Sequence, residues 1–489
     1  MHVRRSKPAT ATEQQCRRLF SILGILGFHL LFGLDGWPAL GQSPETGGFI
    51  ANGSSWGPVV VAAPSVIESS ESTMLSQSEL HHGEFQALKT LLEEQQKQLD
   101  NLSASVDQAD SDSRVVYGSD GFEFETDDGK FSLAIQNRLQ SRYATPFDRD
   151  PRLLSDLDRN ENSFMVRRAR TKMRGHAYYP WLEYYFQYDW ADPILRDFNV
   201  SIAKYKWASV DIGRQKVVFN DERKTSSGRQ QFVNRSIVND IFTVDRQQGI
   251  QVYGNLLPET CVDTTYYLGV FTGLGVGERS NDDDNLMYNA RWQWNVLGGE
   301  LPFSQSDIAF HEHPALNLAF AANTNRSRCL AFETSDNSCR PLPWAPYDTL
   351  GLPGQYRINQ LMGEVRFKWQ GFSLLSELHL KEIIDTLAEQ DDPFKDTEMV
   401  GGFIQAGYFP HYLLPFVPRK LEFSGRYAFV DPKLAIGNIE QQEVSGVATY
   451  FINGHENKVN FQVSHLTLGP DDAPSESEQR YWLQWDISF

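Results

Sequence analysis

Long hydrophobic runs, cysteines and positive charge are all scarce in this sequence of 489 residues. Only Leu19–Leu34 forms a long apolar run, which excludes a protein built from many membrane-spanning helices. The four cysteines and eleven histidines show no spacing typical of a zinc site. Acidic residues outnumber basic ones by 63 to 45, for a net charge of −18. This excess argues against a general nucleic-acid binder, which presents a basic surface.

The N-terminus has the features of a secretory signal peptide. Basic residues such as Arg17 and Arg18 precede the apolar run, and Ala39 and Gly41 follow it at the spacing of a signal peptidase site. The alternative is an uncleaved anchor helix, but Leu19–Leu34 is shorter than the roughly 20 residues needed to span a bilayer. We therefore predict that residues 1–41 are a signal peptide and that the protein is exported.

Export affects whether two of the cysteines are expected to form a disulfide. Cys329 and Cys339 lie ten residues apart in a polar stretch. An oxidising compartment favours a disulfide between them, whereas the alternative is two free thiols in a loop. We expect the disulfide.

Two segments separate the signal peptide from the main body of the chain. Residues 42–80 are rich in Gly, Ser, Pro and Thr without periodicity, which indicates a flexible linker. Residues 81–110 then carry a seam at heptad spacing, made of Phe85, Leu88, Leu92, Gln95, Leu99, Leu102 and Val106. This seam predicts a short coiled coil and an oligomer, which we expect to be a homotrimer. A single amphipathic helix lying on the body of its own protein is the alternative.

From about residue 115 onward, apolar and polar residues alternate with period two. In the last run, one face consists of Tyr481, Leu483, Trp485, Ile487 and Phe489, and the other includes Gln484, Asp486 and Ser488. Successive side chains of a strand point to opposite faces, so this run is a strand with one apolar face. Runs of about nine to eleven such residues are what a transmembrane β-strand requires.

The connections between these runs favour a membrane barrel over a soluble β-sandwich, which also alternates. Short turns are expected at Tyr179-Pro180, Gln370-Gly371 and Asn453-Gly454, and long polar loops at segments such as 217–246 and 322–358. Short turns at one rim and long loops at the other are typical of outer-membrane barrels. We predict that residues 115–489 form an all-β transmembrane antiparallel β-barrel of about 16 strands in outer-membrane lipid. Trp482 lies on the polar face of the last strand, and we expect it at the rim, outside the hydrocarbon.

The most informative chemical feature is the run "VRRARTKMRGH". Four of its cations share one face with Val166 and His176, namely Arg168, Arg170, Lys172 and Arg174. The opposite face carries Ala, Thr and Met and suits lipid better, so the cations should line the lumen at spacings of about 6.6 Å. Arg138 and Arg142 share this orientation on the preceding strand.

Such cations predict a ladder for anions, because guanidinium groups bind phosphate or carboxylate bidentately. The alternative is a network of salt bridges, in which Glu183, Gln187 and Asp189 of the next strand pair with the ladder. Such a network leaves only a mild preference for anions.

Several stretches resemble the phosphate-selective porin O and P family. They are residues 127–143, 164–190 and 195–222, which include the motifs "RRAR" (167–170) and "GRQK" (213–216). The resemblance covers roughly residues 115–489 and implies an outer-membrane porin whose permeant solutes are small anions such as phosphate. It also implies that Lys216, at the end of the hairpin, is a pore-lining candidate.

The loop after this hairpin, residues 220–246, is a second candidate region. It carries the cations Arg223, Lys224, Arg229, Arg235 and Arg246. In porins a long loop folds inward and sets the constriction, and this loop lies at the matching place. The alternative is a surface loop whose cations face solvent.

No enzyme activity, cofactor or metal site is expected, and His311-Glu312-His313 lacks the helical spacing of a zinc protease motif. The sequence therefore predicts an outer-membrane porin for passive diffusion of small hydrophilic solutes, with a preference for anions. A non-transporting barrel with a structural or envelope-anchoring role is the alternative, and a soluble secreted β-sandwich is a third hypothesis.

Overall fold

The computed structural model describes residues 89–100, 114–118, 121–148, 153–157, 160–275, 280–332 and 339–489. The chain forms two units, Met1–Ser105 and Val106–Phe489. In the first unit, residues 89–100 are helical, and Leu92 and Leu99 of the heptad seam are exposed. The predicted signal peptide, the linker and the rest of the coiled coil lie outside the described residues. Among the described helices, none has the length and apolar character needed to cross a membrane.

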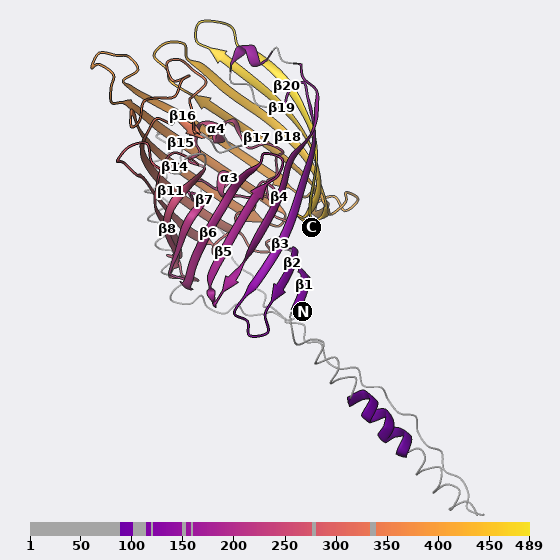
Figure 1. The fold of residues 1–489 in the computed structure, drawn as a ribbon. Helices are drawn as coiled ribbons and strands as arrows, with labels where there is room; N and C mark the ends of the chain where they lie inside the picture. The colour runs from indigo at the N-terminus through magenta and orange to yellow at the C-terminus, as the bar shows by residue number, and fades with distance from the viewer. Residues whose placement is uncertain are drawn as a thin grey trace, which may run out of the picture. The chain divides into compact units, whose positions relative to one another are not determined.

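The second unit is a closed antiparallel barrel of 16 strands, which confirms the predicted fold (Figure 1). Its strands are β3 (Ser132–Thr145), β4 (Ser163–Ala177), β5 (Tyr179–Asp189), β6 (Ile194–Tyr205), β7 (Ala208–Lys216), β8 (Arg246–Leu256), β9 (Thr264–Phe271), β10 (Met287–Leu297), β11 (Ala315–Ser327), β14 (Tyr356–Trp369), β15 (Phe372–Asp385), β16 (Asp396–Tyr408), β17 (Leu421–Asp431), β18 (Ile439–Asn453), β19 (Asn457–Pro470) and β20 (Glu476–Ser488). Each strand pairs with its neighbours in sequence, and β20 pairs with β3 to close the ring.

Period-two alternation decides which side chains face inward. On β19, Asn460 and Gln462 are buried inside, whereas Phe461 between them is half-exposed on the outer face. Polar side chains thus face the interior and apolar ones face outward, the pattern that is typical of a transmembrane β-barrel.

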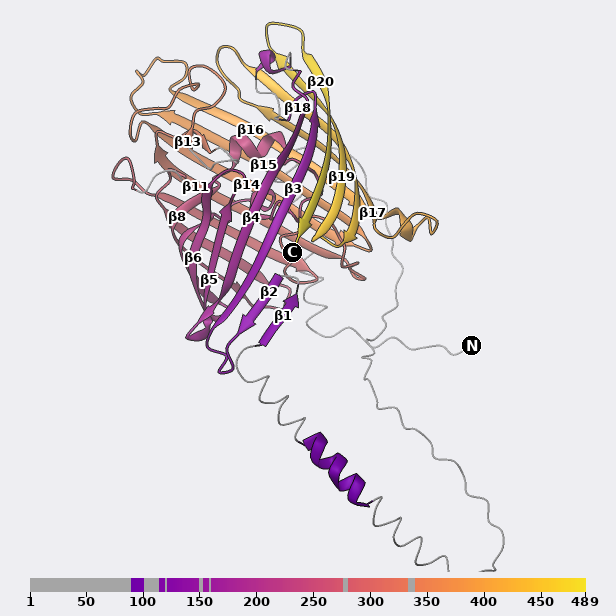
Figure 2. The same cartoon turned by 45° about the vertical axis from the view of Figure 1, so that its right-hand side comes forward.

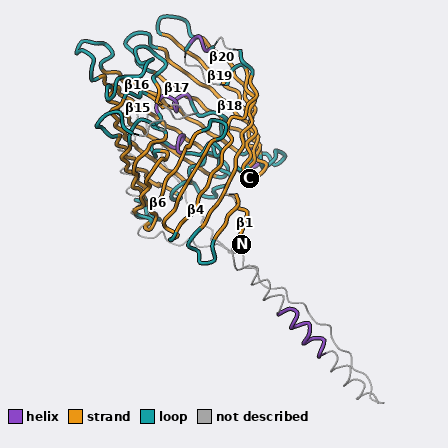
Figure 3. Tube along the Cα trace, viewed as in Figure 1, coloured by secondary structure: helices purple, strands orange, loops and turns teal. Residues whose placement is uncertain are grey.

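Turn chemistry fixes one rim of the barrel. Gln370 and Gly371 both have positive φ, at 47° and 80°, as a two-residue hairpin turn requires. The turn expected at Tyr179-Pro180 was placed one residue too late, because Tyr178 has the positive φ, 68°, and β5 begins at Tyr179. Pro180 is tolerated because β5 pairs with β6 only from Leu182 onward. Figure 3 shows long loops gathered at the opposite end, which we call the loop rim, as distinct from the turn rim.

A β-bulge on β4 corrects the face assigned to Val166. Gln140 pairs with Arg168, but the next residue, Ser141, pairs with Val166, so Arg167 is an extra residue in β4. The bulge shifts the alternation by one position. Val166 is consequently 51% exposed, although it shares sequence parity with the buried Arg168.

Two long connections fold into the barrel instead of outward. Residues 217–245, which we call the strap, follow β7 and contain α3 (Asp221–Lys224) and α4 (Ile237–Phe242). Both short helices lie within the ring of strands (Figure 1). Residues 298–314, which we call the counter-loop, enter from the turn rim between β10 and β11, and Leu301 and Asp307 in it are buried.

The strap builds an apolar core inside the barrel. Ile241 and Phe242 of α4 are fully buried and belong to one cluster with Trp344 and Tyr347 of the β11–β14 loop. Wall residues such as Ile383 complete this cluster. This side of the lumen is therefore packed like a protein interior.

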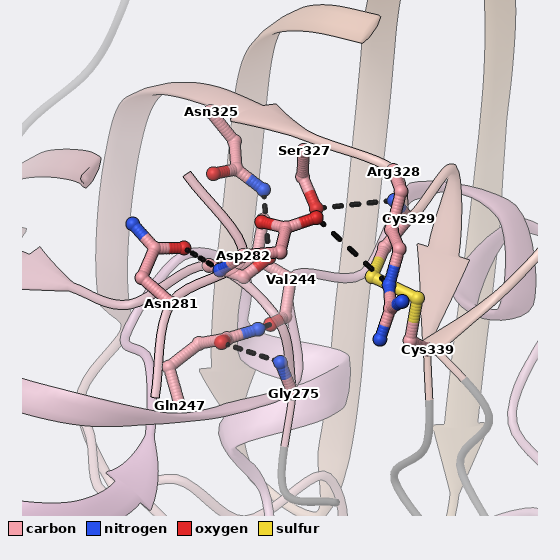
Figure 4. Close-up of a disulfide and its surroundings, with 11 residues drawn as sticks. Val244, Gln247, Gly275, Asn281, Asp282, Asn325, Ser327, Arg328, Cys329 and Cys339 are labelled. Atoms are coloured by element: carbon pink, nitrogen blue, oxygen red, sulfur yellow. Dashed lines mark hydrogen bonds and ion pairs between the residues drawn. A yellow bond between two sulfur atoms is a disulfide. The ribbon is translucent and has the colours of Figure 1, made fainter. Parts of the chain in front are cut away.

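The β11–β14 loop carries the disulfide and a small second sheet of β12 (Ala331–Phe332) and β13 (Cys339–Arg340). The structure bonds Cys329 to Cys339, with an S–S distance of 2.04 Å (Figure 4). Ser327 Oγ accepts a hydrogen bond from the Cys329 amide. The disulfide thus ties the loop close to the end of β11.

A short hairpin precedes the barrel. It consists of β1 (Arg114–Gly118) and β2 (Gly121–Glu125), and β2 pairs with the first residues of β3, Ser132–Ile135 (Figure 2). The later part of the same β3 edge pairs with β20, whose pairing ends at Phe489. The hairpin therefore continues the sheet along an edge that the C-terminus leaves uncovered at the turn rim.

Trp482 lies near the loop rim, opposite Ala144 at the penultimate position of β3, but its ring is buried and does not face open solvent. Its side chain is only 1% exposed and packs against Val233 of the strap and Ala144 of β3. Its indole Nε1 donates a hydrogen bond to the Asp148 carbonyl at 3.3 Å. A polar-face tryptophan is accommodated here because the strap, and not water, occupies this part of the lumen.

We expect Trp482→Ala to lower the free energy of unfolding by about 3–5 kcal/mol, because it leaves a cavity beneath the strap. Trp485→Ala is the matched control, since that ring faces outward and its loss creates no internal cavity. Urea titrations of both variants refolded in lipid vesicles measure the difference. Equal destabilisation of the two variants would contradict the packing role of Trp482.

Candidate functional site

The barrel interior keeps an open region beside β3–β8, where the strap does not fill the lumen. It is a cavity of about 760 Å³. Among its described lining residues, cations outnumber carboxylates by twelve to three. The carboxylates are Asp197, Asp211 and Glu456, and the cations are Arg138, Arg168, Arg170, Lys172, Arg174, Lys216, Arg223, Lys224, Arg229, Arg235, Arg246 and Lys368.

The structure brings together most of the site residues chosen from sequence. Nine of the ten candidate cations line the cavity, and only Arg142 does not. Arg142 is buried nearer the loop rim, where its guanidinium binds Asp148, Gln484 and the Val233 carbonyl. The strap supplies the second wall of the cavity, through residues such as Arg229 and Arg235.

Some of these cations belong to salt bridges that hold the wall. Arg138 binds Asp486 of β20 through two nitrogens, at 2.8 and 2.6 Å. Arg170 binds Asp189 at 2.6 Å. Arg142 pairs with Asp148, and Arg223 pairs with Asp245. Of the partners expected from sequence, only Asp189 takes this role.

Asp486 is distant in sequence from the cation that it pairs with, and only closure of the barrel brings it next to Arg138. Asp245 meets Arg223 because the strap returns to the wall where it started. No spacing in the sequence marks either pair.

Five candidate cations form no ion pair with any described residue. They are Arg168, Lys172, Lys216, Arg229 and Arg235. Arg168 donates only to the side chain of Gln140, at 2.9 Å, and Lys172 donates to that of Gln136, at 3.2 Å. Their charge is left for a ligand from the lumen.

The other members of this group bind neutral oxygens or none. Lys216 Nζ donates to the carbonyl of Arg223 at 2.9 Å, and Arg235 donates to the carbonyls of Glu222 and Thr225, both at 2.9 Å. Burial and the nearby Arg223 lower the pKa of Arg235 to about 9. Arg229 is exposed towards the cavity. A cluster of buried like charges of this kind is relieved when an anion enters.

Carboxylates of the opposite wall hold the strap across the lumen. Glu364 of β14 accepts a hydrogen bond from the Asp221 amide, and Glu377 of β15 accepts one from the Glu222 amide, both at 2.8 Å. Glu443 of β18 accepts one from the Ile237 amide at 3.1 Å. Such amides at helix starts have no partner within their helix and attract negative charge.

The counter-loop meets the strap in the middle of the barrel. The backbone amide of Gln305 donates to the Arg229 carbonyl at 3.1 Å. The side-chain oxygen of Gln305 accepts a hydrogen bond from the backbone amide of Gln231 at 2.9 Å. Ser306 Oγ anchors the counter-loop to Glu422 of β17 at 2.7 Å. The basic cavity therefore lies between these two inward-folded segments and the wall formed by β3–β8. No signal in the sequence distinguished this connection from an ordinary loop.

One family model matches part of the chain. Residues 145–301 match the family model described as phosphate-selective porin O and P, which confirms the resemblance for this part of the chain. A comparison with curated proteins returned no match.

Several solved structures are similar in fold. The outer membrane channel DcaP of Acinetobacter baumannii shares 10% identity over 75% of this chain and 99% of its own, with a TM-score of 0.49. OmpT of Vibrio cholerae shares 9% over 74% and 98%, with a TM-score of 0.48. An anion-selective porin from Comamonas acidovorans shares 10% over 73% and 100%, with a TM-score of 0.47.

We expect Glu364→Gln to loosen the strap. The carboxylate holds the Asp221 amide and pairs with Arg291 at 2.7 Å, so its neutralisation leaves a buried guanidinium without its partner. Breaking a buried pair in this way costs about 3–5 kcal/mol. Hydrogen exchange of peptides from residues 217–245 should rise, whereas the control Glu398→Gln, on the outer face of β16, should leave it unchanged. Unchanged exchange in both variants would contradict the anchoring role.

We also expect the strap to become less stable as the pH rises through neutrality. Burial and the nearby Glu377 raise the pKa of Glu222 from its ordinary 4.5 to about 7, against the lowering effect of Arg426. The folded strap therefore prefers the protonated carboxyl, and this stabilisation is complete below about pH 4.5 and is lost as the pH rises through 7. In the wild type, the urea midpoint of unfolding should be higher below pH 4.5 than above pH 7. In Glu222→Gln, this difference between the two midpoints should be smaller. An equal difference in both proteins would contradict the assignment to Glu222.

Proposed function

We propose that this barrel, whose residues 145–301 match the phosphate-selective porin O and P family, is an outer-membrane channel with a preference for small anions such as phosphate. The family match and the closed barrel support an outer-membrane channel for small solutes. The observation that carries the anion preference is the group of five lumen cations without a carboxylate partner among the described residues. Passive diffusion through the open region beside β3–β8 is the mode of transport.

The arrangement suits passage as well as attraction. Arg168 and Lys172 lie on one strand with Arg170 between them, so cationic positions recur about every 6.6 Å along the wall. An anion exchanges donors step by step and is never held by one closed site. Conduction requires that the anion bind favourably enough to enter the channel, and that this binding be spread over several sites so that the anion can also leave.

The proposal extends to export and assembly. We propose that residues 1–41 are removed as a signal peptide and that the heptad seam over residues 81–110 joins three copies of the chain. The exposure of Leu92 and Leu99 on the described helix supports the second point, because an apolar seam without a partner is unfavourable in water. The outward apolar faces of the strands would contact lipid.

A second function has one observation in its favour. The strap, the counter-loop and the β11–β14 loop fill much of the lumen, as expected for a non-transporting barrel with a structural role. Planar bilayers decide between the two. Anion-selective current supports the channel, cation-selective current leaves a porin without the anion preference, and a sealed bilayer after verified insertion supports the structural barrel.

We expect Arg168→Gln with Lys172→Gln to reduce the preference for anions. A unit charge at 4 Å changes the energy of an anion by about 1 kcal/mol in water, or about fivefold in local concentration for each charge removed. Reversal potentials in a salt gradient measure the permeability ratio of chloride to potassium. The control is Arg357→Gln, an exposed position on β14, which should leave the ratio unchanged. Equal ratios in the wild type and the double variant would exclude these two cations as the source of selectivity.

A further inference from the structure

A second cavity continues from the basic one towards the turn rim. It measures about 720 Å³ and shares Ala134, Arg174 and Tyr185 with the first cavity. The β1–β2 hairpin, which is not one of the sixteen barrel strands, forms part of its wall through residues such as Glu123 and Glu125. A solute that leaves the basic cavity in this direction therefore passes the hairpin.

The charge of this second cavity is opposite to that of the first. Its described charged lining consists of three carboxylates and one permanent cation, Arg174. Glu123 pairs in register with the lumen-facing Ala134, and Glu125 pairs with Ser132. Glu183 lies on β5, opposite Ser201 of β6. Residues paired in register share a face of the sheet, so all three carboxylates lie on the lumen side.

These carboxylates differ from the acids nearer the loop rim. Asp148 pairs with Arg142, and Asp189 pairs with Arg170 and Arg196. Asp197 pairs with Arg246. Glu123, Glu125 and Glu183, in contrast, form no ion pair with any residue that the structure describes. Unpaired negative charge therefore follows unpaired positive charge along the path.

We propose that the β1–β2 hairpin gives the passage an acidic exit, so that a cationic segment and an anionic segment lie in series and the channel conducts better in one direction. The inference rests on the proposed function, because it requires ions to flow through the lumen. It identifies Glu123, Glu125 and Glu183 as residues that set the direction of current, a role separate from that of the cations that select anions.

The direction follows from electrostatics. The basic segment accumulates anions and the acidic segment accumulates cations, because each wall attracts ions of opposite sign. When the turn-rim side is positive, anions move from the basic segment towards the junction and cations move towards it from the acidic exit. Carriers then accumulate, and the conductance is high. The opposite polarity removes both ions from the junction and lowers the conductance.

The experiment compares single-channel currents at equal and opposite voltages in dilute salt, where the screening length is long. The proteins are the wild type, Glu123→Gln with Glu125→Gln, and Glu183→Gln, which tests the same exit from the barrel wall. The control is Glu398→Gln with Glu440→Gln, two exposed carboxylates of β16 and β18. Orientation is read from one-sided block by streptavidin, after biotin is attached to Asp472→Cys at the loop rim in a Cys261→Ser background.

We expect about a twofold current ratio in the wild type and the control, with the larger current when the turn-rim side is positive. The ratio should approach one in the hairpin variant and fall partway in Glu183→Gln, while the reversal potential stays selective for anions. Symmetric current in the wild type, or a ratio unchanged in the hairpin variant, overturns the inference and leaves the channel intact. A bilayer that stays sealed after verified insertion overturns the proposed function together with the inference.

Discussion

The architecture depends on one constraint: every strand of the sheet needs a hydrogen-bonded neighbour on both edges, because an open edge leaves backbone N–H and C=O groups unpaired. The last strand meets this need by pairing with the first, and Phe489 and Asn137 exchange backbone hydrogen bonds at 2.6 and 2.9 Å. Phe489 is therefore part of the seam that closes the barrel. Closure also brings Asp486 next to Arg138, so a salt bridge of the lumen wall is a product of the same constraint.

A closed wall of this size encloses more volume than its own side chains fill, and the interior is divided by chemistry. One side is an apolar core built on α4. The other is lined by cations, part of them neutralised by Asp189, Asp245 and Asp486 and part of them not. The carboxylates that hold the strap, such as Glu364, lie on the wall opposite the cationic cavity. The strap therefore closes one side of the lumen with its apolar core and narrows the other side, where it lines the cationic cavity.

Sequence reasoning found the elements whose signal is local. Period-two alternation identified the strands, and the parity of Arg168 and Lys172 agrees with their orientation because no bulge interrupts β4 between them. The same rule misassigned Val166, since the bulge at Arg167 lies between it and the ladder. It did not predict that Trp482 is buried beneath the strap, because alternation reports which face a residue occupies and not what fills the space in front of that face.

By itself, the sequence determined the fold class, the approximate number of strands and most of the lumen cations, because alternation and charge are properties of neighbouring residues. Only the tertiary structure decided which cations keep a free charge. Arg138 is neutralised by a residue from the other end of the chain, whereas the hydrogen-bond partner of the Arg168 guanidinium among the described residues is the neutral side chain of Gln140. The counter-loop contacts and the hairpin along β3 were likewise decided by the folded chain. Pairing between distant segments depends on barrel closure and on inward-folded loops, which no local pattern encodes.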